Sequence, residues 1–154
     1  MANYLKTLFI LQLVSTVFMT GLIWFVQVVH YPLYNKIAVD SFAIYETIHC
    51  QITTLVVGPP MIVEALTAIL LVYQRPKEIT AWLAVLGFFL VAIIWLATLI
   101  YSIPNHAVLS SGFDKRAYQD LCDFNWIRTI AWSLRTLLLS FWLYKMLPKG
   151  DSAL

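Results

Sequence analysis

Residues 79–103 read ITAWLAVLGFFLVAIIWLATLIYSI, a run that contains no charged side chain. A membrane-spanning helix needs about 20 mostly apolar residues, and this run is long enough. Its residues are apolar on every face, whereas strands of a transmembrane β-barrel alternate between apolar and polar positions. Backbone groups in lipid must satisfy one another, so an isolated run of this kind is helical. The run therefore predicts a transmembrane helix.

Three more runs of this kind lie on either side of the first. Residues 7–29 carry no charge, and residues 52–73 and 124–147 carry few. The first of these is too long for the apolar core of a cleaved signal peptide, so we expect it to be retained. The sequence predicts an all-α fold, a single integral membrane four-helix bundle over residues 1–154 with spans at about 7–29, 52–73, 79–103 and 124–147.

The composition excludes several other classes of protein. Of the 154 residues, 61% are hydrophobic and 12% are charged, whereas soluble domains average about 45–50% and about 25%. A water-soluble globular domain and a disordered chain are therefore excluded. The net charge of +2 is too small for a nucleic-acid-binding surface. We expect the lipid bilayer to be the main partner, and the lateral surface of four spans leaves room for a homo-oligomer.

The connections between the runs are unequal. A short turn, QRPKE at residues 74–78, joins the second and third runs, and the other two connections are about 20 residues long. Each long connection contains a helix-start signal, at Asp40–Ser41 and at Gly112–Asp114. We therefore expect helices two and four to begin there and to project beyond the bilayer. Pro59 and Pro60 lack N–H donors and should kink helix two.

A weak internal repeat relates the two halves of the chain. A shift of 76 residues places His30 on His106, and a shift of 74 places Glu46 on Asp120. Two helical hairpins in the same orientation would then be related by a pseudo-two-fold axis normal to the membrane.

The basic residues indicate the orientation, because Lys and Arg are enriched in cytoplasmic loops. Five lie on the side of the termini and the short turn (Lys6, Arg75, Lys77, Lys145 and Lys149), and three lie on the other side (Lys36, Lys115 and Arg116). We expect cytoplasmic termini and the long connections on the other side of the membrane.

The three histidines of the chain all fall on the side of the long connections. His30 closes the first span, His49 precedes the second, and His106 follows the third. Helical bundles build metal sites from side chains on different helices, and Glu46 shares a helix face with His49 at i−3 spacing. The pattern predicts a metal site near the extracytoplasmic surface, made of His30, Glu46, His49 and His106, and imidazole ligands suit Cu, Fe or Zn.

Other interpretations of these residues stay open. Asp120, Asp123 or Asn125 would hold a second ion in a dinuclear site, or would orient the histidines. Haem b held by two of the histidines is the competing cofactor. The histidines and acids would otherwise handle protons, or would only solvate the helix ends.

Charged residues also occur deep inside the predicted spans. Glu64 and Arg135 lie near the middle of the bilayer, at a rise of about 1.5 Å per residue from the ends of their helices. An unpaired charge is costly at that depth, so we expect a structural ion pair between them. Arg128 lies two turns nearer the histidines on the face of Arg135. With Asn125 it is a candidate catalytic residue, because a guanidinium donates well to a carboxylate, a bound oxygen species or a substrate oxygen.

Cys50 and Cys122 each stand at the start of a long helix on the histidine side. A disulfide that joins helices two and four and a pair of unpaired thiols are both compatible with this placement.

Five stretches resemble an uncharacterised family of small bacterial four-span membrane proteins. They are QVVHYPL at 27–33, YETIH at 45–49, PMIVE at 60–64, GFD at 112–114 and NWIRT at 125–129. Family members often have Y-H-x-x-H in the second stretch, where this chain has Glu46, which can also bind metal. The resemblance carries over His30, His49, Glu64, His106, Asn125 and Arg128 as candidate functional positions.

That family is itself distantly similar to the anthrone-oxygenase-like group of four-span proteins, a likeness that implies oxidation of a lipophilic substrate. The leading hypothesis is a membrane metalloprotein, an oxidoreductase acting on a lipophilic substrate, a quinone or O₂. The alternative is a non-catalytic transporter, channel or assembly subunit whose histidines sense pH or metal.

Overall fold

The computed structural model describes residues 3–147 and is entirely helical over that range, apart from short connections. The first half contains α1 (Asn3–Phe25), the π-helical segment η1 (Val26–His30), α2 (Tyr31–Leu33), the short 3₁₀ segment η2 (Tyr34–Lys36) and α3 (Val39–Tyr73). The second half contains α4 (Ala81–Ala97), the π-helical segment η3 (Thr98–Ser102), α5 (Ile103–Leu109) and α6 (Lys115–Met146).

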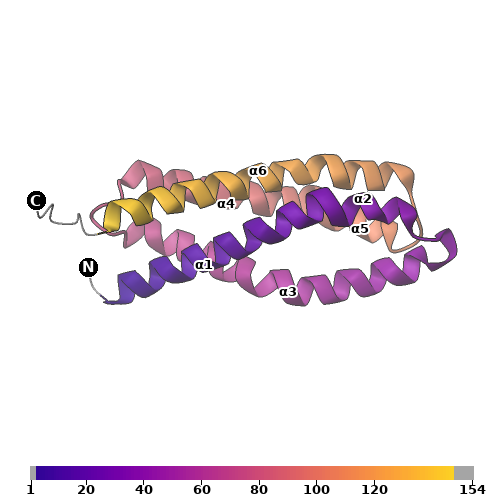
Figure 1. The fold of residues 1–154 in the computed structure, drawn as a ribbon, viewed down its shortest axis with the longest axis horizontal. Coiled ribbons are helices and arrows are strands. Elements are labelled where there is room, and N and C mark those ends of the chain that lie inside the picture. Colours follow the sequence, from indigo (N-terminus) through magenta and orange to yellow (C-terminus); the bar gives the residue numbers. More distant parts are fainter. Residues whose placement is uncertain (1–2, 148–154) are drawn as a thin grey trace, which may run out of the picture.

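These elements form an antiparallel four-helix bundle, which confirms the predicted fold class. α1 packs against α3 and α6, and α4 packs against the same two helices. The start of α1, the end of α6 and the turn between α3 and α4 lie at one end of the bundle, and the two long connections lie at the other (Figure 1). Lys149, one of the basic residues counted for the orientation, lies outside the described residues.

Over residues 3–147 the bundle consists of four continuous helical segments, and three of them are long and apolar enough to cross a membrane: Asn3–Lys36, Val39–Tyr73 and Ala81–Leu109. α6 covers the predicted fourth span and has 32 residues, but it is less apolar because its interior carries Arg128 and Arg135. These two arginines are buried, whereas Ile130 and Leu137 on the same helix are 55% and 67% exposed. α6 therefore turns its polar side chains inward and an apolar face outward, as a lipid-facing helix does.

Both π-helical segments are explained by a proline. The Tyr31 N–H binds the carbonyl of Val26, and the Ile103 N–H binds that of Thr98, five residues back in each case. Pro32 and Pro104 follow directly. A proline ring clashes with the carbonyl four residues earlier and offers no N–H, so the turn before it widens.

The two π-helical segments correct the register of the internal repeat. Residue 26 corresponds to residue 98 and Pro32 to Pro104, which is a shift of 72 residues, and Cys50 falls on Cys122 at the same shift. This shift differs from the shifts of 76 and 74 predicted from the histidines and acids.

Both projecting helices begin where the sequence predicts. α3 begins at Val39 and α6 at Lys115. The Asp114 side chain caps α6 by accepting a hydrogen bond of 2.7 Å from the Ala117 N–H, which satisfies one free donor of the first turn. The preceding Gly112 has a φ of +143°, a backbone conformation that favours glycine. α3 stays helical through Pro59 and Pro60.

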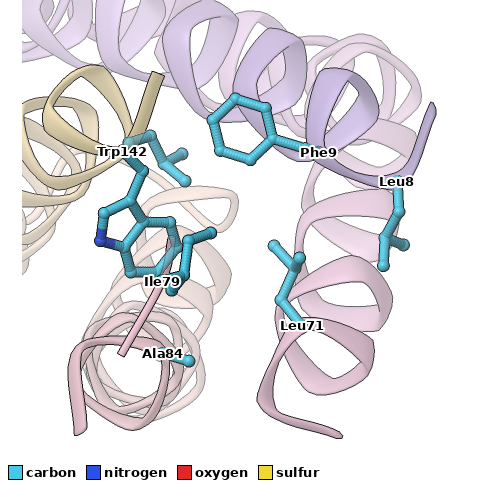
Figure 2. Close-up of a cluster of buried hydrophobic side chains, with 7 residues drawn as sticks. Leu8, Phe9, Leu71, Ile79, Ala84 and Trp142 are labelled. Carbon is cyan, nitrogen blue, oxygen red and sulfur yellow. The ribbon is translucent and has the colours of Figure 1, made fainter. Parts of the chain in front are cut away.

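The core consists of three layers along the bundle. The layer at the end of the short turn contains Leu8, Phe9, Leu71, Ile79, Ala84, Leu139 and Trp142, and Figure 2 shows it between the ends of the helices. The middle layer surrounds Trp132, and the third layer, at the end of the long connections, is built on Tyr31, Tyr34 and Phe42. The histidines lie beside this third layer.

Candidate metal centre

Glu46, His49 and His106 form a group that could hold a metal ion. One potential ligand atom of each residue lies within 4.8 Å of those of the other two. Glu46 and His49 are three residues apart on α3, and His106 comes from α5. Glu46 is fully buried, and the two histidines are partly buried. Among residues 3–147 no other group of three His, Cys, Asp or Glu side chains converges in this way.

Glu46 and His106 contact each other directly. The His106 Nδ1 and the Glu46 Oε1 are hydrogen-bonded. The His106 Nε2 lies 3.1 Å from the Tyr31 hydroxyl, and the ring nitrogen that carries the proton decides the direction of both hydrogen bonds. The result is a hydrogen-bonded chain from the Tyr31 phenol through the imidazole to the carboxylate.

His49 is oriented by its own helix. The Thr53 hydroxyl lies 3.0 Å from the His49 Nδ1, one turn further along α3. Hydrogen bonds to the second nitrogen commonly fix the ring orientation of histidine ligands. The same hydroxyl lies 3.4 Å from the His49 Nε2, so the contact with Nδ1 is the shorter of the two.

His30 lies next to the group of three without belonging to it. Its ring centroid is 4.6 Å from that of His49, and the Tyr34 ring meets both histidines edge-on at 5.1 and 5.8 Å. The three imidazoles therefore do gather at one level, as predicted. The close set of donors is Glu46, His49 and His106, because the His30 ring packs against the neighbouring rings.

The histidines line a cavity of about 440 Å³ between α1, α3, η3 and α5. Its deeper walls are apolar, with Met19, Ile23 and Val57 among the lining residues. Thr98, Ser102 and His106, which follow one another at i+4 spacing, line one side. Cavities of this volume accommodate small molecules.

Arg128 of α6 also lines this cavity and is 8% exposed. Its Nη1 donates to the Ser102 hydroxyl at 2.7 Å, and its guanidinium lies 5.4 Å from the centre of the Trp132 ring. The Tyr31 phenol lies next to the guanidinium as well. Tyr31 thus connects Arg128 to the Glu46–His106 pair.

Several buried polar atoms around this site have no hydrogen-bond partner. They are His30 Nε2, Tyr34 OH, Glu46 Oε2 and Arg128 Nε. Buried polar groups in proteins are nearly always paired, so four unpaired ones around a single site, two of them from the cavity-lining residues His30 and Arg128, point to something bound there. The unpaired carboxylate oxygen of Glu46 suits a metal ion, and the unpaired N–H donor of Arg128 suits a ligand oxygen.

The other predicted members of the site lie elsewhere. The Asn125 side chain is buried and donates to Gln27 Oε1 at 2.8 Å. It ties α6 to η1 and does not line the cavity. Asp123 is exposed and Asp120 half-exposed, and neither belongs to a group of potential ligands. Residues 3–147 therefore contain one such group of potential ligands, and neither α6 acid adds a second one.

The two cysteines are free. Cys50 lines the cavity and donates to Glu46 Oε1 at 3.5 Å. Cys122 lies on α6, and its backbone carbonyl accepts from Gln27 at 3.1 Å. Burial raises the pKa of the Cys122 thiol above its usual range, because the thiolate would lose its hydration.

The predicted contact between Glu64 and Arg135 is present in the middle of the bundle. Arg135 Nε donates to Glu64 Oε1 at 2.9 Å, and both side chains are at most 3% exposed. Thr16 and Trp132 also donate to the carboxylate, at 2.6 and 2.9 Å. A second nitrogen of Arg135 donates to the carbonyl of Gly87 on α4. The network links all four long helices.

Tyr31, Tyr34, Thr53 and Cys50 also take part in the site, although the sequence interpretation did not select them. The only signal for Tyr31 was its place between His30 and Pro32, in one of the stretches that resemble the four-span family. Comparisons of the chain with protein-family models, curated proteins and solved structures found no match.

Proposed function

We propose that this protein is a membrane metalloprotein that binds one transition-metal ion, Cu, Fe or Zn, at Glu46, His49 and His106. The observation that carries the proposal is the convergence of three potential ligand atoms within 4.8 Å, two of them from histidines that line a largely apolar cavity. One carboxylate and two imidazoles are typical ligands for these metals. Imidazoles packed against one another leave no gap for a macrocycle between them, so this donor set favours a single ion over haem b.

The cavity favours an enzyme that acts on a lipophilic substrate. A bound Cu or Fe ion would supply redox chemistry, and Zn would supply a Lewis acid. The residues of the chain do the rest: the apolar walls bind the body of the substrate and exclude water, and Thr53 holds the His49 ring. Tyr31 and His106 hold a proton between Nε2 and the phenol oxygen at the edge of the cavity. A phenol or another reduced lipophilic molecule as the electron donor, with a quinone or O₂ as the electron acceptor, are the reactants that fit a redox ion here.

The test is metal content. The purified protein should retain close to one ion per chain after dialysis against Cu, Fe or Zn, measured by elemental mass spectrometry. Glu46→Gln, His49→Ala and His106→Ala should each lose most of it. Asp123→Asn, which removes an exposed carboxylate of α6, is the matched control and should keep it. A wild-type chain that binds none of the three metals would refute the proposal.

The variant His30→Ala tests whether His30 is a ligand, as the sequence predicts, or lies outside the ligand group, as in the structure. Because His30 lies outside the close group, its loss should weaken metal binding less than the loss of His49. Equal losses would instead make His30 a fourth ligand.

One observation favours a second candidate function, a non-catalytic transporter, channel or assembly subunit with a proton-sensing cluster. The hydrogen bond between His106 and Glu46 uses two of the three potential ligand residues for each other. A metal-free protein whose conformation changes with pH in the wild type, but not in Glu46→Gln, would support this alternative.

A further inference from the structure

Arg128 is a buried cation whose counter-ion is missing from the protein. The residue is only 8% exposed, and among residues 3–147 the only ion pairs within 4.0 Å are His106–Glu46 and Arg135–Glu64. Its contacts are a serine hydroxyl, a tyrosine and a tryptophan ring. A buried charge without an opposite charge is strongly unfavourable, so this position favours an anion from outside the chain.

The guanidinium also has a free hydrogen-bond donor. Arg128 Nε is buried without a partner, while the side chain lines the 440 Å³ cavity. The other arginine of the core shows the contrast, because Arg135 has a carboxylate partner at 2.9 Å through its own Nε. The equivalent donor of Arg128 has no partner among residues 3–147, and the side chain that carries it lines the cavity.

The cavity opens sideways, between α3 and α5. Three of the residues that line it are exposed: Thr54 on α3, and Ile103 and Ala107 on α5. These positions lie at the ends of the second and third predicted spans, where a membrane has its polar head groups. A molecule dissolved in that layer would reach the cavity without passing through water.

We propose that the cavity binds an anionic amphiphile, a lipophilic molecule with a carboxylate or phenolate group, which enters between α3 and α5 and pairs with Arg128. We rest this on the proposed function, since it names the substrate class of the same cavity. The apolar tail lies along Met19, Ile23 and Val57, and the anionic oxygen accepts from Arg128 Nε. The oxygen then lies beside Tyr31, one side chain away from His106.

The ligand can be varied while the protein is left unchanged. Dansyl-undecanoic acid and its methyl ester differ only in charge and in the oxygen that Arg128 would bind. Energy transfer from tryptophan to dansyl reports binding, because Trp132 lies beside Arg128. In lipid nanodiscs, corrected for empty nanodiscs, the acid should bind the wild-type chain about tenfold or more tightly than the ester, as expected for a charge-assisted hydrogen bond.

Variants of Arg128 complete the test. Arg128→Gln should remove the preference for the acid, and Arg128→Lys should restore part of it. Arg116→Gln, which removes an exposed arginine of the same helix, should bind like the wild type. Dodecylphenol, measured by displacement at a pH above its pKa, separates phenolates from carboxylates. Equal binding of acid and ester by the wild type, or an unchanged preference in Arg128→Gln, would overturn the proposal.

The same measurement on chelated protein separates this inference from the metal site. A preference for the acid in protein that binds no metal would support the anion site while the proposed metal function fails. A metal-loaded protein that binds acid and ester equally would support the metal site while the anion site fails. Ala107→Trp, at the exposed rim, should slow the entry of the acid, whereas the same change at Ala43, on α3 away from the cavity, should not.

Discussion

Glu64 is a buried carboxylate that accepts hydrogen bonds from three side chains on two other helices. Thr16 comes from α1, and Trp132 and Arg135 come from α6. In an apolar environment each partner of such a pair depends on the other, because a single remaining charge has neither water nor an opposite charge.

This dependence predicts a large coupling between Glu64 and Arg135. Glu64→Gln and Arg135→Met should each reduce the free energy of unfolding by about 3–5 kcal/mol. The double variant should lose much less than the sum, since the amide oxygen introduced by Glu64→Gln would still accept from Thr16 or Trp132. Reversible unfolding in mixed micelles measures the three values. Additive losses would show that the ion pair is energetically unimportant.

At the scale of the element, the π-helical segments decide where the histidines lie. η3 adds a residue to its turn, and His106 follows four residues after its end. In an α-helix each residue turns the following side chains by about 100°. Closing η3 into regular α-helix would therefore rotate His106 relative to Glu46.

This makes Pro104 a residue with an effect beyond its own contacts. Pro104→Ala restores an N–H that can bind the carbonyl of Ile100 and removes the clash that widens the turn. Metal affinity should fall by about tenfold or more, comparable to the loss of an orienting contact, while helix content and thermal stability stay the same or rise. Elemental analysis and circular dichroism together measure both effects.

Pro59→Ala is the control for that variant. Pro59 lies inside α3, where the helix stays in the α conformation, and the nearest proposed metal ligand on that helix, His49, is more than two turns away. It should leave metal content unchanged. Equal metal loss in both variants would mean that general helix stiffness, instead of the π-helical turn, positions the cluster.

At the scale of the whole molecule, the bundle buries a set of polar and charged side chains among its apolar core and exposes large apolar side chains on its outer surface. The buried set includes Gln12, Gln27, Glu64, Asn125, Arg128 and Arg135, while large apolar side chains such as Leu55 and Leu137 are 77% and 67% exposed. This distribution fits a lipid environment, and three of the four helical segments have the length and apolarity to span a membrane. The orientation remains a prediction from the basic residues.

The orientation predicts the outcome of a fusion experiment. Alkaline phosphatase fused after Met146 should be inactive in a bacterial host, because that end would be cytoplasmic, and the enzyme inserted at Gly112 should be active. The Lys and Arg residues near the short turn account for this direction. Activity at Met146 and none at Gly112 would place the histidine cluster on the cytoplasmic side.

The sequence by itself determined the helical class, the approximate helix ends and the level at which the histidines gather. Long uncharged runs leave helices as the only way to satisfy the backbone in lipid, and helix-start signals at Asp114 and near Asp40 act locally. The Glu64–Arg135 contact could also be predicted, because two opposite charges at the same depth have few other partners.

Only the tertiary structure decided which donors converge and what lies beside them. The direct Glu46–His106 bond, the place of His30 outside the ligand group and the contacts of Tyr31 depend on how α1, α3 and α5 rotate about their axes. Two prolines set part of that rotation by widening the turns before them, and side-chain packing sets the rest. The unpaired donor of Arg128 could also be found only in the tertiary structure. The sequence does not show which charged groups surround a residue.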